Sequence, residues 1–317
     1  IFERIVSLEN LFLAWREFRR GKSKKRDVQE FEFNLEDNIF QLHEELRAKV
    51  YRHLPYAAFY ITDPKLRHIH KACIRDRVVH HAVFRILYPV FDPTFIFDSY
   101  SCRLGKGTHR AVSRLKKFAR ALSLNYQRNI FVLKCDVKKF FDSVNHRVLL
   151  EFIQRKIKNK NSVWLIKTIV GSFEKESSVG LPIGNVTSQL FANIYLNEFD
   201  QFVKHALKVK YYIRYCDDFV ILGANPSELV DLVSCVGKFL NYRLKLVIHP
   251  DKVTIRKYRQ GIDFLGYVVR PHCITLRTKT RRRLLKRLST KNLASYFGTL
   301  KHCDGYKIEQ QITKLML

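Results

Sequence analysis

The stretch Tyr215-Cys216-Asp217-Asp218 decides the fold that we predict for this chain. It stands between two β-prone runs, residues 211–214 and 219–222, which is typical of a β-hairpin with this stretch at its tip. The tip contains neither Asn-Gly nor Asp-Gly, so it lacks the usual two-residue turn of low strain. Two adjacent carboxylates repel each other, and a cation bound between them would explain their position.

A third carboxylate, Asp136, ends another β-prone run at residues 131–136. Carboxylate oxygens suit Mg²⁺, and two such ions about 3.5–4 Å apart can clamp the attacking and leaving oxygens of a phosphoryl transfer. An Asp-Asp pair alone would more often be a solvated hairpin tip, but the flanking strands and the upstream aspartate favour a site. Asp136, Asp217 and Asp218 are therefore candidate catalytic residues and candidate ligands of two Mg²⁺ ions.

The composition indicates a nucleic-acid partner. The chain has 317 residues, with 58 Lys and Arg against 29 Asp and Glu, so its formal net charge is +29. A charge this positive points to a polyanion, and the basic residues are spread along the chain, as a long basic channel requires. We expect no membrane association, because there is no apolar run of about 18 residues, no signal peptide and no strongly amphipathic basic helix near the start.

The cysteines and histidines do not indicate a metal or disulfide framework. Seven cysteines are present, none of them spaced as C-x-x-C, which argues against a zinc knuckle or paired disulfides. Reduced thiols are the default in cytoplasm, which is the expected localisation. The pairs His68/His70 and His80/His81 lack a Cys or acidic cluster at ligand spacing, so we expect them to bind no metal.

The order of the expected elements favours an α+β fold on an antiparallel sheet, because strands and helices alternate irregularly. Helices are expected at residues 8–18, 28–49, 78–87, 110–122, 148–153, 188–207 and 226–242 and in the basic tail from residue 278. A strand is expected at residues 56–62, followed by a turn at Asp63-Pro64-Lys65 and a second strand after that turn. Further strands are expected at residues 131–136, 211–214, 219–222, 244–248, 253–256 and 264–269. Pro89 is expected to close one helix, and Asn185 or Thr187 to cap the helix from residue 188.

Four runs follow the order of reverse-transcriptase motifs, namely residues 131–144, 180–190, 214–222 and 261–267. Together they resemble most closely the reverse transcriptases of diversity-generating retroelements. The decisive piece is Leu181-Pro182-Ile183-Gly184-Asn185-Val186-Thr187-Ser188-Gln189. Retroviral and group II intron enzymes usually carry Gln before this Gly and Pro after this Ser, where this sequence has Ile183 and Gln189. Residues 63–67, 75–77 and 100–109 also look like the retroelement family.

The resemblance implies an RNA-directed DNA polymerase shaped as a right hand, with fingers, a palm that contains an antiparallel sheet, and a short helical thumb. The implied divisions are an N-terminal helical extension at 1–50, fingers at 51–125, a palm at 126–272 with fingers helix segments at 145–180, and a thumb at 273–317. It also implies bacterial, archaeal or phage origin.

The resemblance further implies roles for single residues. Asp136, Asp217 and Asp218 would be the palm carboxylates, with the Val137 carbonyl completing the Mg²⁺ ligands, and Lys252 would donate a proton to the leaving pyrophosphate. The nucleotide-binding residues would be Lys65, Arg67, Phe141, Ile183, Gly184 and Gln189. The grip on the primer end would comprise Phe264, Leu265, Gly266 and Tyr267.

Ile183 carries the prediction about accuracy. A branched apolar side chain cannot hydrogen-bond to the incoming nucleotide, so we hypothesise reduced fidelity, chiefly opposite template adenine, as the family implies. The implied partners are template RNA, the RNA/cDNA duplex, dNTPs and an accessory variability protein, which is a small basic helical oligomer in this family.

Two alternatives remain open. Asp142 stands where Pro is common in the retroelement family and Asp is common in group II intron enzymes. A group II-like or phage-defence reverse transcriptase is therefore the second interpretation. The third is a catalytically idle RNA-binding scaffold, against which the three intact aspartates argue.

Overall fold

The computed structural model describes residues 1–63 and 65–316 of the chain. They divide into two compact units, each assembled from three separate segments. The first unit comprises Ile1–Ile96, Lys138–Gln201 and Phe239–Val247, and the second comprises Phe97–Val137, Phe202–Lys238 and the chain from Ile248 onward. Segments far apart in the sequence therefore build each unit.

The first unit is mainly helical. Its helices are α1 (Phe2–Val6), α2 (Leu8–Arg19), α3 (Arg26–Phe33), α4 (Leu35–Arg47), α5 (Ile74–Phe91), α7 (Phe140–Ser143), α8 (His146–Lys156), α9 (Lys160–Val170) and α10 (Val186–Gln201). The helix expected at 28–49 is wrong as a single element, because Asn34 has φ −114° and ψ 43° and separates α3 from α4. Pro89 does not close its helix either. It lies in the last turn of α5, where a proline removes only one backbone hydrogen bond.

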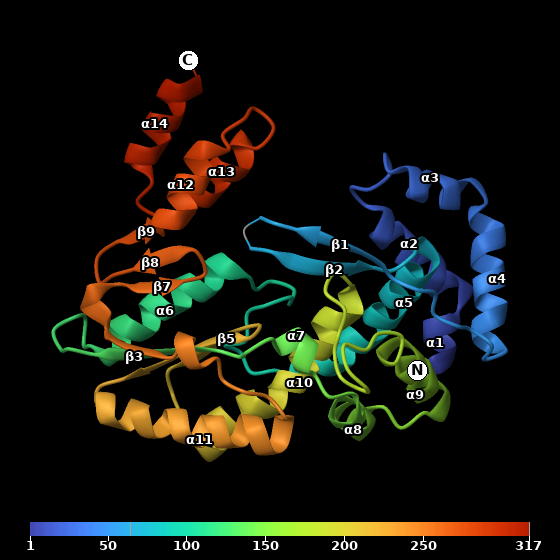
Figure 1. Cartoon of the computed structure of the whole chain (residues 1–317), viewed down its shortest axis with the longest axis horizontal. Helices are drawn as coiled ribbons and strands as arrows, with labels where there is room; N and C mark the ends of the chain where they lie inside the picture. Colours follow the sequence, from blue (N-terminus) through green and yellow to red (C-terminus); the bar gives the residue numbers. More distant parts are fainter. Residues whose placement is uncertain (64, 317) are drawn as a thin grey trace. The chain divides into compact units, whose positions relative to one another are not determined.

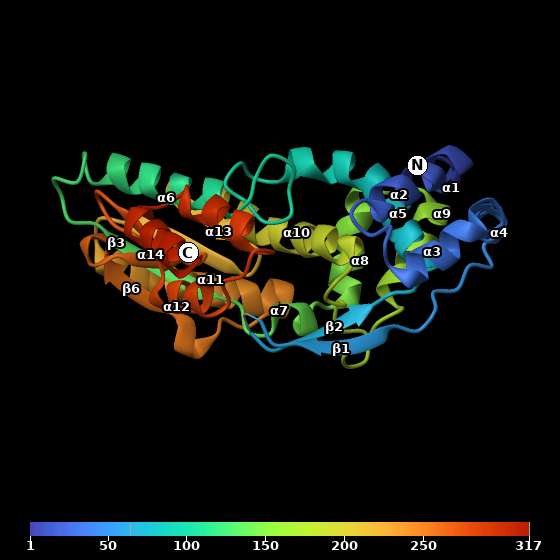
Figure 2. The same cartoon turned by 90° about the horizontal axis from the view of Figure 1, so that it is seen from above.

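A two-stranded hairpin belongs to the same unit. β1 (Ala57–Ile61) pairs antiparallel with β2 (Arg67–Lys71), with Ala57 opposite Lys71, and the two strands lie side by side in Figures 1 and 2. The two expected strands are confirmed. The expected turn at Asp63-Pro64-Lys65 includes residue 64, which lies outside the described residues.

The second unit contains a four-stranded antiparallel sheet in the order β4-β5-β3-β6. Its strands are β3 (Phe131–Asp136), β4 (Tyr212–Tyr215), β5 (Asp218–Gly223) and β6 (Thr254–Lys257). A second sheet, in the order β7-β8-β9, is formed by β7 (Ile262–Phe264), β8 (Tyr267–Val269) and β9 (Ile274–Leu276). The expected hairpin and its upstream strand are confirmed.

Two expected strands are wrong. Residues 244–248 form no strand, because α11 (Pro226–Leu244) runs further than expected and Lys245 then adopts φ 54°. Residues 264–269 form a hairpin rather than one strand. Leu265 and Gly266, with φ 51° and 89°, make the two-residue turn between β7 and β8, and positive φ at both positions is the geometry that such hairpins prefer.

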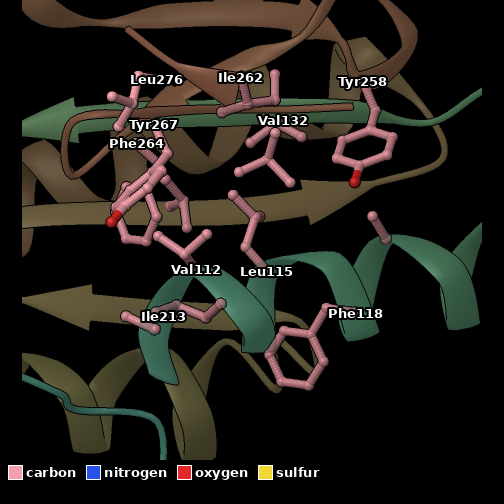
Figure 3. Close-up of a cluster of buried hydrophobic side chains, with 14 of the residues drawn as sticks. Val112, Leu115, Phe118, Val132, Ile213, Tyr258, Ile262, Phe264, Tyr267 and Leu276 are labelled. Carbon is pink, nitrogen blue, oxygen red and sulfur yellow. The ribbon is translucent and has the colours of Figure 1, made fainter. Parts of the chain in front are cut away.

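The core of the second unit lies between the helix α6 (Thr108–Leu122) and the two sheets (Figure 3). α6 is strongly amphipathic, and its apolar side chains Val112, Leu115 and Phe118 face Val132 and Ile213 of the four-stranded sheet. The tail adds the helices α12 (Thr278–Lys286), α13 (Leu293–Leu300) and α14 (Tyr306–Met316). The helical tail is therefore confirmed. No helix among the described residues combines the length and apolarity needed to cross a membrane.

Candidate active site

The hairpin tip is a tight turn formed by Cys216 and Asp217. Tyr215 ends β4 and pairs with Asp218, which begins β5, so only two residues connect the strands. Cys216 has φ 54°, a left-handed conformation that is uncommon for a residue with a side chain. The turn before the two aspartates therefore includes one residue in a backbone conformation that costs free energy.

Arg214 supports this turn from inside the unit and is 1% exposed. Its Nη1 donates to the Cys216 carbonyl and its Nη2 donates to Ser99 Oγ, both at 3.1 Å. The sequence analysis treated Arg214 only as part of a β-prone run. A buried arginine beside an acidic turn gives no local signal that separates it from an exposed one.

Asp136 lies beside the tip. β3 pairs antiparallel with β5 so that Asp136 is opposite Asp218, and the Val137 N–H donates to the Asp217 carbonyl at 3.2 Å. The structure thus brings together the three aspartates and Val137, all from the second unit. Two strands paired in register fix this arrangement.

Burial and mutual repulsion act on two of these carboxyls. Burial is the main cause that raises the pKa of Asp218 to about 6, with Lys134 opposing it and the nearby Asp217 and Asp136 adding to it. Burial and then the charge of Asp136 also raise the pKa of Asp217. A divalent cation would stabilise the charged form of both groups.

The Lys252 ammonium neutralises part of the negative charge of these carboxylates. Its Nζ donates to Oδ1 of Asp136 at 2.8 Å. The preceding turn is fixed by the His249 N–H, which donates to the Asp136 carbonyl at 2.8 Å. The Lys252 side chain is 42% exposed, so water screens the pair and it contributes little to stability.

The three carboxylates and the Val137 carbonyl are oxygen donors of the kind that Mg²⁺ prefers, but the carboxylate side chains are not grouped around one point. Among residues 1–63 and 65–316, no three His, Cys, Asp or Glu side chains are grouped so that they would hold a metal ion. Three carboxylates nevertheless stand on adjoining strand ends, and oxygen donors of this kind suit Mg²⁺.

The residues expected to bind the nucleotide all belong to the first unit. Lys65 and Arg67 are exposed at the end of the β1–β2 hairpin. The turn before α10 is joined to β2, since the His70 N–H donates to the Ile183 carbonyl at 3.0 Å. The turn is also joined to α7, because the Leu181 N–H donates to the Phe141 carbonyl at 2.7 Å.

The remaining two expected nucleotide contacts flank this connection. Gly184 follows Ile183 with φ 121°, and Gln189 is exposed in the first turn of α10. The structure therefore places Phe141, Ile183 and Gly184 on neighbouring backbone segments.

The expected primer grip surrounds the turn between β7 and β8 in the second unit. Phe264 and Tyr267 are buried, and Tyr267 Oη donates to the Thr299 carbonyl at 3.1 Å. Leu265, Gly266 and Tyr267 line a cavity of about 590 Å³. Its other walls include the basic side chains Lys106, His109, Arg110, Arg283 and His302. A cavity with this lining suits a phosphate-bearing ligand.

Known proteins are similar to this chain in sequence and in fold. Residues 62–269 match the family model described as reverse transcriptase (RNA-dependent DNA polymerase). Protein YkfC of Escherichia coli (strain K12) is 30% identical over 71% of this chain and 69% of its own length. The group II intron-encoded protein LtrA of Lactococcus lactis subsp. cremoris is 24% identical over 74% of this chain, which spans half of LtrA.

Two solved structures show the same fold at low sequence identity. The apo telomerase of Candida tropicalis has a TM-score of 0.54 and 13% identity, and covers 79% of this chain and 52% of its own. The telomerase of Candida albicans, solved with a fragment of telomeric RNA, has a TM-score of 0.52 and 14% identity, and covers 72% of this chain and 46% of its own. The predicted α+β polymerase-like fold with antiparallel sheets is therefore confirmed.

Proposed function

The chain belongs to the reverse transcriptase (RNA-dependent DNA polymerase) family, and we propose that it copies the template-repeat RNA of a diversity-generating retroelement into adenine-mutagenised cDNA. The observation that carries the polymerase part is the position of Asp136 beside Asp217 and Asp218. The subfamily part rests on the sequence, where Ile183 and Gln189 replace the Gln and Pro of other branches.

In the proposed mechanism Asp136, Asp217 and Asp218 would hold two Mg²⁺ ions together with the Val137 carbonyl. When bound, such ions neutralise the phosphates and lower the pKa of an attacking hydroxyl. The Lys252 ammonium already lies at the edge of this group, 2.8 Å from Asp136. We assign it the proton that the leaving pyrophosphate takes up.

The proposed division into parts follows the right hand. Residues 51–125 act as fingers, residues 126–272 as palm with fingers segments at 145–180, and residues 273–317 as a short thumb. Lys65 and Arg67 hold the triphosphate, and Phe141 packs under the sugar, where a large ring excludes a 2′-hydroxyl. Residues 264–267 hold the primer end beside the basic cavity.

The proposed partners follow from the charge and the subfamily. A net charge of +29 suits template RNA and the RNA/cDNA duplex. The incoming dNTPs are the substrates, and a small basic helical oligomer is the accessory protein. The proposed setting is the cytoplasm of a bacterial, archaeal or phage-infected cell.

The first prediction tests the subfamily through Ile183. Ile183→Gln restores a side chain that can hydrogen-bond to the nucleotide, so it should lower misincorporation opposite template adenine several-fold while other template bases are copied as before. Sequencing of cDNA made by the wild type and by Ile183→Gln on one defined RNA template measures this. Val50→Gln, which makes a similar apolar-to-Gln change at an exposed position of the first unit, is the control. An unchanged adenine error rate in Ile183→Gln would contradict the proposal.

A group II-like reverse transcriptase is the second candidate, and two observations favour it. LtrA is a relative, and Asp142 is the residue common in that branch. The DNA beside the gene separates the two candidates, because a diversity-generating element needs a template repeat and a matching variable repeat nearby. A phage-defence reverse transcriptase would lack both repeats and an intron.

A further inference from the structure

The turn that carries Ile183 is fastened to β2 by three contacts within the first unit. The His70 N–H donates to the Ile183 carbonyl at 3.0 Å, and Asn185 Nδ2 donates to the His70 carbonyl at 3.2 Å. Between them, Gly184 packs so tightly on Ile69 that a Cβ would lie 3.1 Å from Ile69 Cγ2. Both backbone groups of His70 are thus used to hold this one turn.

Asn185 directly precedes α10, where an asparagine normally caps the helix with its side-chain oxygen. Of the two caps expected from the sequence, Asn185 does not act as one. Asn185 is 3% exposed, and its Oδ1 accepts no hydrogen bond from any described residue. The amide instead uses its nitrogen to hold β2. A buried side chain that leaves one polar atom unsatisfied in order to make a different contact indicates that this contact matters.

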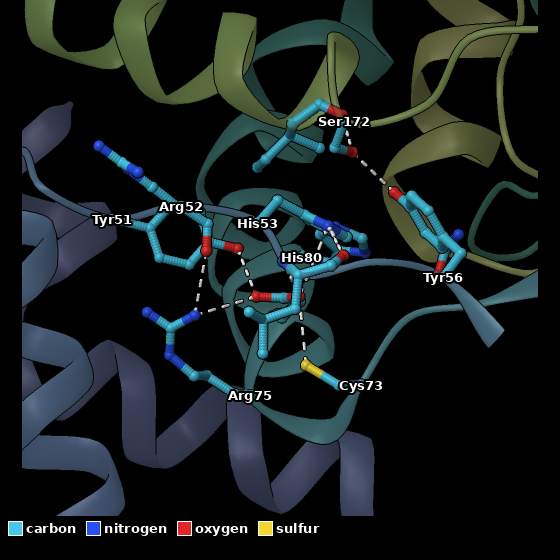
Figure 4. Close-up of polar contacts among 12 residues, drawn as sticks. Tyr51, Arg52, His53, Tyr56, Cys73, Arg75, His80 and Ser172 are labelled. Atoms are coloured by element: carbon cyan, nitrogen blue, oxygen red, sulfur yellow. Dashed lines mark hydrogen bonds and ion pairs between the residues drawn. The ribbon is translucent and has the colours of Figure 1, made fainter.

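A chain of buried polar groups begins at Asp76, which is fully buried at the start of α5. Figure 4 shows Tyr51, His53 and His80 of this group. The Asp76 carboxylate accepts hydrogen bonds from Tyr51 Oη at 2.8 Å and from the Leu54 N–H at 2.9 Å. It also lies 3.5 Å from Nδ1 of His53. These partners fix Asp76 and orient the His53 ring.

The orientation of the His53 ring in turn determines which nitrogen of His80 carries a proton. Nδ1 of His53 faces two acceptors, Asp76 and the Leu54 carbonyl at 2.6 Å, so it carries a proton. Nε2 of His53 lies 3.1 Å from Nε2 of His80, and the two rings stack with centroids 5.1 Å apart. In a neutral pair His80 therefore donates from Nε2, and its Nδ1 is left as an acceptor.

His80 is the neighbour of Asn185. Burial lowers the pKa of His80 well below its usual value, and Asn185 is the group that opposes this shift. Nδ1 of His80 is buried and makes no hydrogen bond to a described residue, like Oδ1 of Asn185. The Asn185 side chain therefore lies against the buried His80 ring, while its amide nitrogen donates to the His70 carbonyl.

We propose that Asn185 is a positioning residue, which fixes the Ile183 turn on β2 through its hydrogen bond to the His70 carbonyl and thereby controls nucleotide selection. The effect of Asn185 on nucleotide selection rests on the proposed function. The fastening, meaning the attachment of the Ile183 turn to β2, does not. Loss of the Asn185 side chain frees one carbonyl of β2 and lets the turn separate from the strand that carries Arg67.

Hydrogen exchange of the His70 amide tests the fastening without any activity. This amide donates to Ile183, so in Asn185→Ala it should exchange about 5-fold faster, as expected for the loss of one hydrogen bond. Asn10→Ala is the matched control. Asn10 is also buried in the first unit and donates to the Ile5 and Ala82 carbonyls at 2.9 and 3.1 Å. It should lower the melting temperature and leave His70 exchange unchanged. Equal His70 exchange in Asn185→Ala and wild type would overturn the proposal.

Single-nucleotide incorporation on an RNA template tests the consequence. Asn185→Ala should raise the KM for the correct dNTP about 5-fold with kcat nearly unchanged, and should alter the error spectrum, whereas Asn10→Ala should do neither. Should Asn185→Ala fail to fold, Asn185→Asp takes its place, because it keeps the size of the side chain and removes the Nδ2 donor to the His70 carbonyl. An altered KM in both Asn variants would mean general destabilisation and would reject positioning.

If Ile183→Gln leaves the errors unchanged while His70 exchange still responds, the proposed function fails and the fastening stands.

Discussion

At the scale of single residues, the contact between Lys252 and Asp136 links the charge of the site to its chemistry. The ammonium holds a carboxylate oxygen that an ion would also need. Lys252 therefore has two roles in the proposal, as a counter-charge before ions bind and as a proton donor afterwards. Replacing Lys252 by a neutral side chain of similar length removes its charge and its proton while keeping most of its packing contacts.

Lys252→Gln should lower kcat by about 100-fold or more, because a positioned general acid typically contributes about 10²–10⁴-fold. The KM for dNTP should change little. Steady-state single-nucleotide incorporation measures both constants. Lys257→Gln, an exposed lysine on β6, provides the comparison. A loss of kcat no greater than that of Lys257→Gln would exclude Lys252 as the acid.

Asp218 makes stability depend on pH in a predictable direction. Its pKa in the folded protein is about 6, above the value of about 3.9 in an unfolded chain. Between these values the folded state binds more protons than the unfolded state, so this group lowers stability as pH rises from about 4 to about 6. Asp218→Asn removes that loss. The variant should therefore melt above the wild type at pH 8 but lose this advantage at pH 4, as followed by circular dichroism. The same difference in melting temperature at both pH values would contradict the assigned charge state.

At the scale of elements, the strands of the palm-like sheet follow from local sequence, whereas the turns that join them do not. The β-prone runs at 131–136 and 219–222 predict β3 and β5, and their register places Asp136 opposite Asp218. The run at 264–269 is equally apolar, yet it folds back on itself at Leu265 and Gly266. A glycine inside an apolar run has no local feature that distinguishes a bend from a continuous strand.

The candidate site, too, could be predicted only where local sequence determines it. The three aspartates were predicted because strand ends bring acidic residues to one edge. The support from Arg214, the ion pair with Lys252 and the fastening by Asn185 depend on contacts 115 or 116 residues apart in the sequence. No spacing rule reaches that far, so these contacts appear only in the folded chain.

The short sheet β7-β8-β9 depends on Gly261, which has φ 91° directly before β7. A Cβ at this position would lie 2.9 Å from Val268 Cγ1. Gly261→Ala should therefore lower the free energy of unfolding by about 2–3 kcal/mol, from the left-handed backbone and the overpacking together. Gly298→Ala has open space in helix α13 and should cost nothing or stabilise by up to about 1 kcal/mol. Urea unfolding of both variants measures this, and equal effects would contradict the packing at Gly261.

At the scale of the whole molecule, the two units divide the expected functions between them. The carboxylates, Lys252 and the expected primer grip belong to the second unit, whereas the expected nucleotide contacts belong to the first. Each unit takes three segments of the chain, so domain limits drawn as continuous stretches remain predictions. The net charge of +29 belongs to the chain as a whole and suits a polyanionic partner.

The most direct test of the central claim is the Mg²⁺ dependence of primer extension on an RNA template by the wild type, Asp217→Asn and Asp231→Asn. Asp231 is an exposed aspartate of α11 in the same unit and controls for the loss of one negative charge. We predict that extension by the wild type and by Asp231→Asn rises with Mg²⁺ to the same plateau, while Asp217→Asn stays at background throughout. Equal extension by Asp217→Asn and the wild type would contradict the claim that these carboxylates hold the catalytic ions.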